Sequence, residues 1–306
     1  MNARFQQVDV FTATPFEGNQ LAVFENGDDI PEALMPVLAR EMNFPESVFL
    51  LSHPRAGTDA RLRIFTPEEE LPMAGHPTIG TTFVLAALGR IRAPQPRVTL
   101  DLQVGPTAVE LEWNDDGTLR FAWMNQQPPA FGTPLPTALR ADLARALNVE
   151  EVDILPLPLQ TVSSGVPFSY VPLASDEAVD RAAADQLALR TLFSRAGEER
   201  TRPVYVFAMS HRPGVTCYSR MFAPEFGIPE DPATGGASGP LGAYVLRHGL
   251  VTREQAASML SLQGVKMHRP SRISIAVGAS TDGAIETLRV GGQAVIVGHG
   301  EIRLPG

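Results

Sequence analysis

The chain has 306 residues, of which 44% are hydrophobic and 19% are charged, and this composition excludes a disordered chain. Its 25 basic and 34 acidic residues give a net charge of −9, which argues against nucleic acid or an anionic membrane as a partner, because both require a basic face. One cysteine excludes an internal disulfide, and no apolar run reaches the roughly 18 residues of a membrane span. Because no signal peptide pattern follows Met1, we expect a cytoplasmic protein.

The first half of the chain predicts short strands with two helices among them. Leu34, Leu38 and Met42 recur every four residues and indicate one buried helix face. The Asp-Gly pair at 116–117 indicates the turn of a hairpin. In chain order we expect strands at 5–11 and 20–24, a helix at 31–42, strands at 47–51 and 60–65, a helix at 77–88, and a hairpin of 107–113 with 119–123.

A proline-rich stretch, Asn125 to Pro136, lies near the chain midpoint and predicts an extended connector. At about 150 residues per domain the length suits two domains, so we place an N-terminal lobe at 1–126 and a C-terminal lobe at 127–306. The last strand, at about 294–306, is a candidate to complete the first lobe. Within the second lobe we expect helices at 135–147, 177–195 and 237–248, and strands at 203–209, 215–222, 273–277, 285–290, 293–298 and 301–304. Strands and helices do not alternate, which favours an α+β fold of curved sheets, each around a helix.

An internal repeat connects the two halves. Arg63 to Glu68 (RIFTPE) matches Arg220 to Glu225 (RMFAPE), 157 residues later. A short acidic loop, a segment of small residues and a predicted helix follow each copy. An offset of half the chain length indicates two similarly folded lobes rather than a solenoid, and a ligand site is expected in a cleft between them.

The small-residue segments hold Gly75 and Gly235, each just before a predicted helix. The first N–H groups of a helix are unpaired and carry the positive end of its dipole, and glycine allows a ligand to approach them closely. Two such helix ends would bind a small carboxylate without a basic side chain. The alternative is that both segments are ordinary helix-entry turns, with Pro77 at the first helical position.

Three side chains are candidate acids and bases. Glu46 precedes an apolar strand, where burial would raise its pKa and suit it to proton transfer near neutral pH; the alternative is a solvated strand-entry residue. His76 lies within the first glycine segment, and Asp231 lies within the second, where it either exchanges protons or caps a turn. The histidines lack HExxH or HxH spacing, so a metal site is not indicated, and we expect Cys217 to be a buried strand residue.

Several segments resemble the PhzF-like family, named for an isomerase of phenazine biosynthesis and built on the diaminopimelate epimerase fold. They occur in family order over nearly the whole chain. The matching segments are 8–12 with 15–19, 45–47, 63–67 with 75–78, 162–165, 230–235, 263–264, 269–271 and 290–292.

The resemblance implies two similar domains with the active site between them, a homodimer, and catalysis without metal or organic cofactor. It implies that Glu46 takes a proton from one substrate carbon and returns it to another, assisted by His76 and Asp231. Gly75, His76, Gly235 and Gly236 match the backbone loops that bind the substrate carboxylate. The two cysteines of the related epimerases are replaced by Ala74 and Pro232, so racemisation by a thiol pair is not available.

Gly236 departs from the founding phenazine isomerase, which has serine at this position. The loss of that hydroxyl argues against dihydro-hydroxyanthranilate as the substrate. We therefore expect a cofactor-independent isomerase of a small carboxylate. The alternatives are an epimerase or dehydratase of an amino or hydroxy acid, or a metabolite-binding protein without catalysis.

Overall fold

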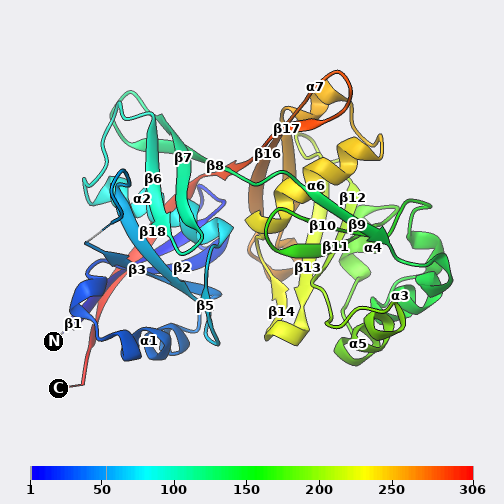
Figure 1. Cartoon of the computed structure of the whole chain (residues 1–306), viewed down its shortest axis with the longest axis horizontal. Helices are drawn as coiled ribbons and strands as arrows, with labels where there is room; N and C mark the ends of the chain where they lie inside the picture. Colours follow the sequence, from blue (N-terminus) through cyan, green and yellow to red (C-terminus); the bar gives the residue numbers. More distant parts are fainter. Residues whose placement is uncertain (1, 53, 306) are drawn as a thin grey trace. The chain divides into compact units, whose positions relative to one another are not determined.

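The chain folds into two compact units in a computed structural model that describes residues 2–52 and 54–305 (Figure 1). Unit 1 comprises residues 1–125 together with 290–306, and unit 2 comprises residues 126–289. The division falls at the beginning of the proline-rich stretch.

Unit 1 is built mainly from strands. Strand β18 pairs antiparallel with β1, β1 with β2, β3 with β4, and β6 with β7, while β2–β3 and β4–β6 are parallel. Its elements are β1 (Asn2–Val10), β2 (Asn19–Phe24), α1 (Met35–Met42), β3 (Glu46–Leu51), β4 (Ala60–Phe65), β5 (Glu70–Leu71), α2 (Gly75–Ala87), β6 (Arg97–Leu102), β7 (Gly105–Trp113), β8 (Leu119–Asn125) and β18 (Ala294–Arg303).

Unit 2 follows the same plan with additional helices. Strands β11 and β12 are parallel, β12–β13 and β13–β14 are antiparallel, β13–β15 are parallel and β15–β16 antiparallel. Its elements are β9 (Ala130–Pro134), α3 (Arg140–Ala146), β10 (Gln160–Ser163), β11 (Pro167–Pro172), α4 (Asp176–Arg181), α5 (Gln186–Arg195), β12 (Val204–Met209), β13 (Cys217–Ala223), β14 (Ile228–Asp231), α6 (Gly235–Arg247), α7 (Arg253–Ala256), β15 (Met259–Gln263), β16 (Ser271–Ala279) and β17 (Ile285–Gly292), which ends in unit 1.

The pairings show that the two units share one topology. The series β2, β3, β4, β5, β6, β7 of unit 1 corresponds to β11, β12, β13, β14, β15, β16 of unit 2, with the same parallel and antiparallel steps. Helix α2 follows β5 as α6 follows β14. The expected pseudo-symmetric α+β fold is confirmed.

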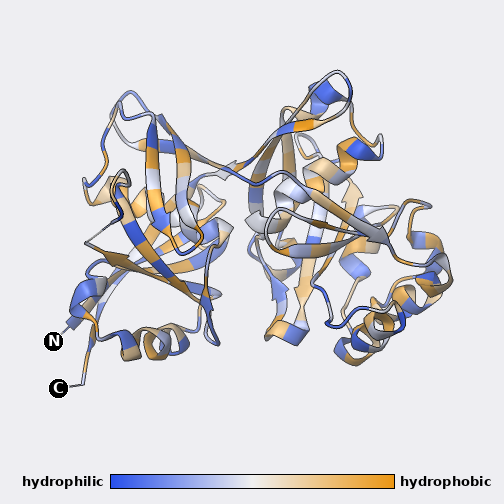
Figure 2. Ribbon diagram, viewed as in Figure 1, coloured by the Kyte–Doolittle hydropathy of each residue, from blue (hydrophilic) through white to orange (hydrophobic). Residues whose placement is uncertain are grey.

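One helix forms the centre of each unit. In α2 every residue from Gly75 to Leu85 is buried, and in α6 the run from Ala237 to Val245 is buried. A helix that is buried on all sides cannot show an amphipathic pattern, so its core position is a consequence of the sheet that surrounds it. Helices α3 and α5 instead lie on the surface of unit 2 and carry alternating hydrophobic and hydrophilic residues (Figure 2).

The repeated sequence motif has a structural role that the sequence did not disclose. Arg63 binds Glu70 through two hydrogen bonds of 2.8 Å, and its guanidinium lies over the Phe65 ring. Arg220 binds Glu230 in the same way, at 2.8 and 2.7 Å, and lies over Phe222. Each pair ties a short strand, β5 or β14, to the strand beside it, just before the glycine segment.

Several predicted elements differ from the structure. The helix expected at 135–147 begins with a 3₁₀ turn, Thr137–Leu139, and is α-helical only from Arg140 to Ala146. The helix expected at 177–195 is two helices, because Asp185 accepts a hydrogen bond from the Ala188 N–H and starts α5 anew. The helix expected at 31–42 begins with a 3₁₀ turn, Glu32–Leu34, and becomes α-helical at Met35. The two strands expected at 293–298 and 301–304 are one strand, β18, which pairs along the full length of β1.

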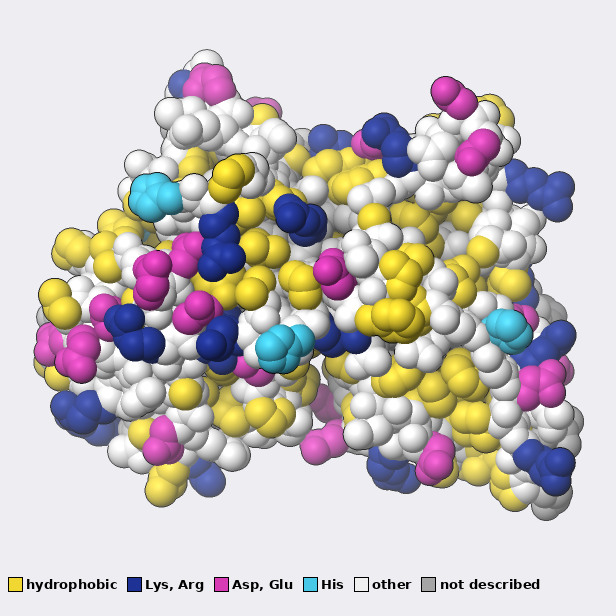
Figure 3. Space-filling view, turned by 180° about the vertical axis from the view of Figure 1, so that it is seen from behind, with side chains coloured by type: hydrophobic (Ala, Val, Ile, Leu, Met, Phe, Trp, Pro, Cys, Tyr) yellow, Lys and Arg dark blue, Asp and Glu magenta, His cyan; other side chains and the backbone are white. Residues whose placement is uncertain are grey.

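The surface of the described residues carries both signs of charge. On the face in Figure 3, Lys and Arg side chains lie among Asp and Glu rather than in one continuous patch. Within residues 2–52 and 54–305, no helix is long and apolar enough to cross a membrane.

Candidate active site

Glu46 is the first residue of β3, opposite Leu21 of the parallel neighbour β2. Its side chain is only 14% exposed, so it does not extend into bulk water. The strand that follows, Val48 to Leu50, is buried and holds the residue at the edge of the core of unit 1. The structure thus places this carboxyl group in the partly buried setting that the sequence predicted.

His76 is the second residue of α2 and lies against Glu46. Its Nε2 is 3.3 Å from Oε2 of Glu46, and the imidazole is 4% exposed. The two atoms are in contact but not aligned as a hydrogen bond. The structure therefore brings together two of the predicted site residues, which are 30 positions apart in the sequence, within one unit.

Burial favours the neutral form of the His76 imidazole. Burial disfavours the charged ring and lowers its pKa from 6.5 to about 3. The amide nitrogen of Asn19 lies 3.2 Å from Nδ1, and with the amide assigned this way round it donates to Nδ1, which places the ring proton on Nε2, the atom that faces Glu46. The contact between His76 and Glu46 is thus an N–H group against a carboxyl group rather than an ion pair.

The glycine segments form the first turns of the helices rather than preceding them. Helix α2 begins at Gly75 and α6 at Gly235, so Pro77 is the third helical residue and not the first. No side chain caps either N-terminus, although Thr234 occupies the N-cap position of α6. Each helix thus directs backbone N–H groups and the positive end of its dipole at a place where a carboxylate can bind.

Asp231 lies at the end of β14 in unit 2 and is 8% exposed. Its Oδ2 accepts a hydrogen bond of 2.6 Å from the hydroxyl of Thr234, the residue just before Gly235. Asp231, Gly235 and Gly236 are therefore held together in one turn of unit 2. An alanine methyl group at Gly236 would meet only the Phe168 ring, at 4.0 Å.

Sequence reasoning missed the polar residues that hold these groups. Asn19 orients His76, and Gln126 donates a hydrogen bond of 2.9 Å to the Gly235 carbonyl. Gln263 binds both Asp231 and Thr234. Asn19 and Gln263 lie in segments that carry the family resemblance, and this resemblance was the one feature of the sequence that could have identified them.

Cys217 is not a candidate catalytic residue. It lies on β13 and is 2% exposed, which confirms the expected buried strand residue. Burial raises the pKa of its thiol to about 12, so it remains protonated and unreactive near neutral pH.

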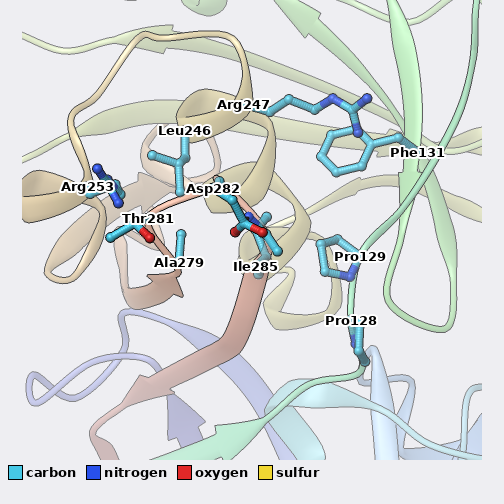
Figure 4. Close-up of a pocket in the computed structure, with 12 residues that line it drawn as sticks. Pro128, Pro129, Phe131, Leu246, Arg247, Arg253, Ala279, Thr281, Asp282 and Ile285 are labelled. Carbon is cyan, nitrogen blue, oxygen red and sulfur yellow. The ribbon is translucent and has the colours of Figure 1, made fainter.

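A cavity of about 560 Å³ in unit 2 contains none of these residues (Figure 4). Two arginines on its wall are already engaged, since Arg247 lies over the Phe131 ring and Arg253 donates to the Ser280 carbonyl. We therefore do not place the function in this cavity. In the described part of the chain, no three His, Cys, Asp or Glu side chains lie close enough together to hold a metal ion.

The fold is shared with solved structures of a probable proline racemase and a hydroxyproline epimerase. A probable proline racemase from Agrobacterium radiobacter K84 superposes with a TM-score of 0.66, at 14% identity, over 99% of this chain and 93% of that one. This likeness defines the diaminopimelate epimerase-like fold class.

More similar proteins define the family. A sequence model of the PhzC-PhzF family, described as phenazine biosynthesis-like protein, matches residues 8–300. A trans-2,3-dihydro-3-hydroxyanthranilate isomerase of Pseudomonas fluorescens is 38% identical over 302 residues, covering 97% of this chain and 98% of the relative. The crystal structure of a Bacillus anthracis phenazine biosynthesis protein of the PhzF family superposes with a TM-score of 0.87, at 25% identity, over 99% of this chain and 100% of that one. The chain belongs to the PhzC-PhzF family and is an isomerase of that family.

Proposed function

We propose that this protein isomerises a small carboxylate by moving a proton from one substrate carbon to another through Glu46. The observation that carries the proposal is the partly buried Glu46 carboxyl group in contact with His76, at the uncapped N-terminus of α2. Family membership supports an isomerisation, and the site supplies the groups that such a reaction uses.

In the proposed reaction Glu46 acts first as a base. A substrate C–H bond breaks, its proton moves to the Glu46 carboxylate, and the electron pair stays in the substrate, where the double bond shifts. Glu46 then returns the proton to a second carbon, and the formula of the substrate is unchanged. His76 remains neutral throughout and offers its Nε2–H as a hydrogen-bond donor beside Glu46.

The substrate carboxylate has to bind beside a carboxylate base of the same charge. Backbone N–H groups at Gly75 and His76, and at Gly235 and Gly236, offset that repulsion through the positive ends of two helix dipoles. We propose that N–H groups of this kind bind the substrate carboxylate, with Asp231 as the assisting acid–base group. The shared topology of the units and the resemblance to the family support this arrangement.

A carboxyl group suffices for the proposed proton transfer, so no metal or organic cofactor has a role in it. The homodimer implied by the resemblance stays a prediction. The substrate of the Pseudomonas fluorescens relative is not assigned to this chain, because Gly236 lacks the hydroxyl that the resemblance leads us to expect.

Product analysis tests this proposal. We would incubate the protein in D₂O with trans-2,3-dihydro-3-hydroxyanthranilate and with a panel of small unsaturated and hydroxy carboxylates, chosen for their ability to raise the melting temperature. We expect an accepted compound to yield an isomer of the same formula, identified by mass spectrometry and NMR. Loss of water would indicate a dehydratase and inversion at one carbon an epimerase, and tight binding without any proton exchange would contradict catalysis.

A further inference from the structure

The side-chain amide of Gln263 is fully buried and uses its whole hydrogen-bonding capacity. Its Oε1 accepts from the Thr234 backbone N–H and from the Tyr205 hydroxyl, both at 3.1 Å. Its Nε2 donates to the Asp231 carbonyl at 2.8 Å and to the Thr234 hydroxyl at 3.0 Å. Only one orientation of the amide is allowed, because the flipped one would place NH₂ against the Thr234 N–H.

The orientation of this amide fixes the hydroxyl of Thr234. Since Oγ1 accepts from Gln263, its single proton is donated to Oδ2 of Asp231, at 2.6 Å. The same hydroxyl would otherwise cap α6, as threonine at an N-cap commonly does. Gln263 therefore accounts both for the contact with Asp231 and for the absence of a side-chain cap at Gly235 and Gly236.

The hydrogen bonds extend from Gln263 through three further side chains, and each of these side chains donates its proton toward Gln263. Because the Tyr205 proton is donated to Gln263, Ser219 donates to Tyr205 at 2.9 Å, and Ser261 in turn donates to Ser219 at 2.9 Å. Tyr205, Ser219 and Ser261 are each 0% exposed. Aligned hydrogen bonds polarise one another, so the series of hydrogen bonds as a whole acts on the Asp231 carboxylate at its end.

Unit 1 builds the same fold without these polar groups. When Arg63 is aligned with Arg220 and the strand registers are followed, the equivalent side chains in β3, β4 and β6 are aliphatic and at most 3% exposed. Leu71 likewise stands at the position of Asp231. The equivalent pairs, with the residue of unit 2 first, are Ser219 and Leu62, Ser261 and Leu100, Tyr205 and Val48, Gln263 and Leu102, and Thr234 and Ala74.

This comparison separates the requirements of the fold from those of the site. An aliphatic core suffices at these positions in unit 1, and burying polar groups is unfavourable unless each one is paired. The polar groups of unit 2 are paired and end at Asp231. We infer that Gln263 and Thr234 are positioning residues that hold Asp231 in one orientation and favour its ionised form, an inference that rests on the proposed function of Asp231.

A proton relay along the same path does not fit the groups present. A relay requires each member to accept one proton and release another, as hydroxyls do. The amide of Gln263 interrupts the path between Tyr205 and Thr234, and it keeps both of its protons. The role assigned to Gln263 is therefore orientation.

NMR of the Asp231 carboxyl carbon tests the inference without a substrate. With ¹³C-labelled aspartate and the signal assigned by its loss in Asp231→Asn, we expect the pKa of Asp231 to be about one pH unit higher in Thr234→Val than in the wild type. Thr234→Ser keeps the hydroxyl and should restore the wild-type value. Thr191→Val, at an exposed threonine, is the matched control, and the neighbouring Arg220–Glu230 pair is the same in every variant.

Gln263→Leu introduces the residue that unit 1 has at this position. We expect it to fold with a melting temperature below that of the wild type, because the Tyr205 hydroxyl, the Thr234 N–H and the Asp231 carbonyl each lose a buried partner. We expect it to raise the pKa of Asp231 by less than Thr234→Val does, because the hydroxyl remains but is no longer held. An unchanged Asp231 titration in Thr234→Val would overturn the inference. Shifted titrations in a protein that never exchanges substrate protons would overturn the proposed function instead.

Discussion

His76 is the single residue whose surroundings constrain the proposed chemistry most. Burial favours the neutral imidazole, so at physiological pH it places an N–H group beside Glu46 and does not supply a positive charge. In the proposed reaction, stabilisation of negative charge on the substrate is then left to backbone N–H groups at a helix N-terminus.

The lowered pKa of His76 predicts a pH dependence of stability. The unfolded ring has a pKa near 6.5 and the folded ring near 3, so the unfolded state binds more protons between these values. Stability from this residue is present above about pH 6.5 and is lost as the pH falls. Between pH 7.5 and 5.5 we expect His76 to account for a loss of about 1.4 kcal/mol in the free energy of unfolding.

Urea unfolding at the two pH values gives the change in the free energy of unfolding for the wild type and for His76→Gln. The difference between these two changes is the contribution of His76. His299→Gln, at an exposed histidine, should keep the wild-type dependence. If His76→Gln lost as much stability as the wild type between the two pH values, the pKa of His76 would not be lowered on folding and the account of its burial would be wrong.

Some site residues could be predicted from the sequence and others could not. Glu46 and His76 stand out because an acid precedes an apolar strand and a histidine lies within a glycine segment. Gln263 is an ordinary strand residue in the sequence, and its contact with Thr234 spans 29 positions that only the fold brings together. A buried hydrogen-bond network leaves no periodic pattern, whereas a hydrophobic face does.

Among the helices and strands, too, some could be predicted from the sequence and others could not. The hairpin β7–β8 was predictable because its Asp-Gly turn and its partner strands are adjacent in sequence. The missed strands are β5, β6, β9, β10, β11, β14 and β15. Strands β5, β10 and β14 have four residues or fewer, and the pairing partners of the others are set by the sheet. The break between α4 and α5 depends on one cap, Asp185, within a segment that is otherwise rich in helix formers.

The two arginine–glutamate pairs predict unequal contributions to stability. Arg220 is 9% exposed and also donates to the carbonyls of Val179, Asp180 and Ala182, whereas Arg63 is 22% exposed. Arg220→Met would leave the Glu230 carboxylate and three carbonyl groups without their donor, and we expect it to lower the free energy of unfolding by about 3–5 kcal/mol.

Arg63→Met is the matched comparison, since it removes the same kind of pair from the equivalent strand. Its partner Glu70 is 30% exposed and remains solvated, so we expect a loss of about 1 kcal/mol or less. Urea unfolding of both variants measures the difference. Equal losses would show that burial does not determine how much these ion pairs contribute to the free energy of unfolding.

At the scale of the whole molecule, the two units share a fold but carry different chemistry. The position of Glu46 in unit 1 is occupied by Pro203 in unit 2, and the position of Asp231 in unit 2 is occupied by Leu71 in unit 1. Each unit therefore contains one of the two proposed acid–base residues and one central helix with an uncapped N-terminus. The repeat itself was predictable from RIFTPE and RMFAPE, but this division of roles required the strand registers.

The central claim is that Glu46 carries the proton. The most direct test follows the entry of solvent deuterium into an accepted carboxylate by NMR, with the wild type, Glu46→Gln and the exposed-site control Glu41→Gln compared in D₂O. We expect exchange in Glu46→Gln to be at least about a hundredfold slower than in the wild type, and exchange in Glu41→Gln to be unchanged. Exchange at the wild-type rate in Glu46→Gln would contradict the account.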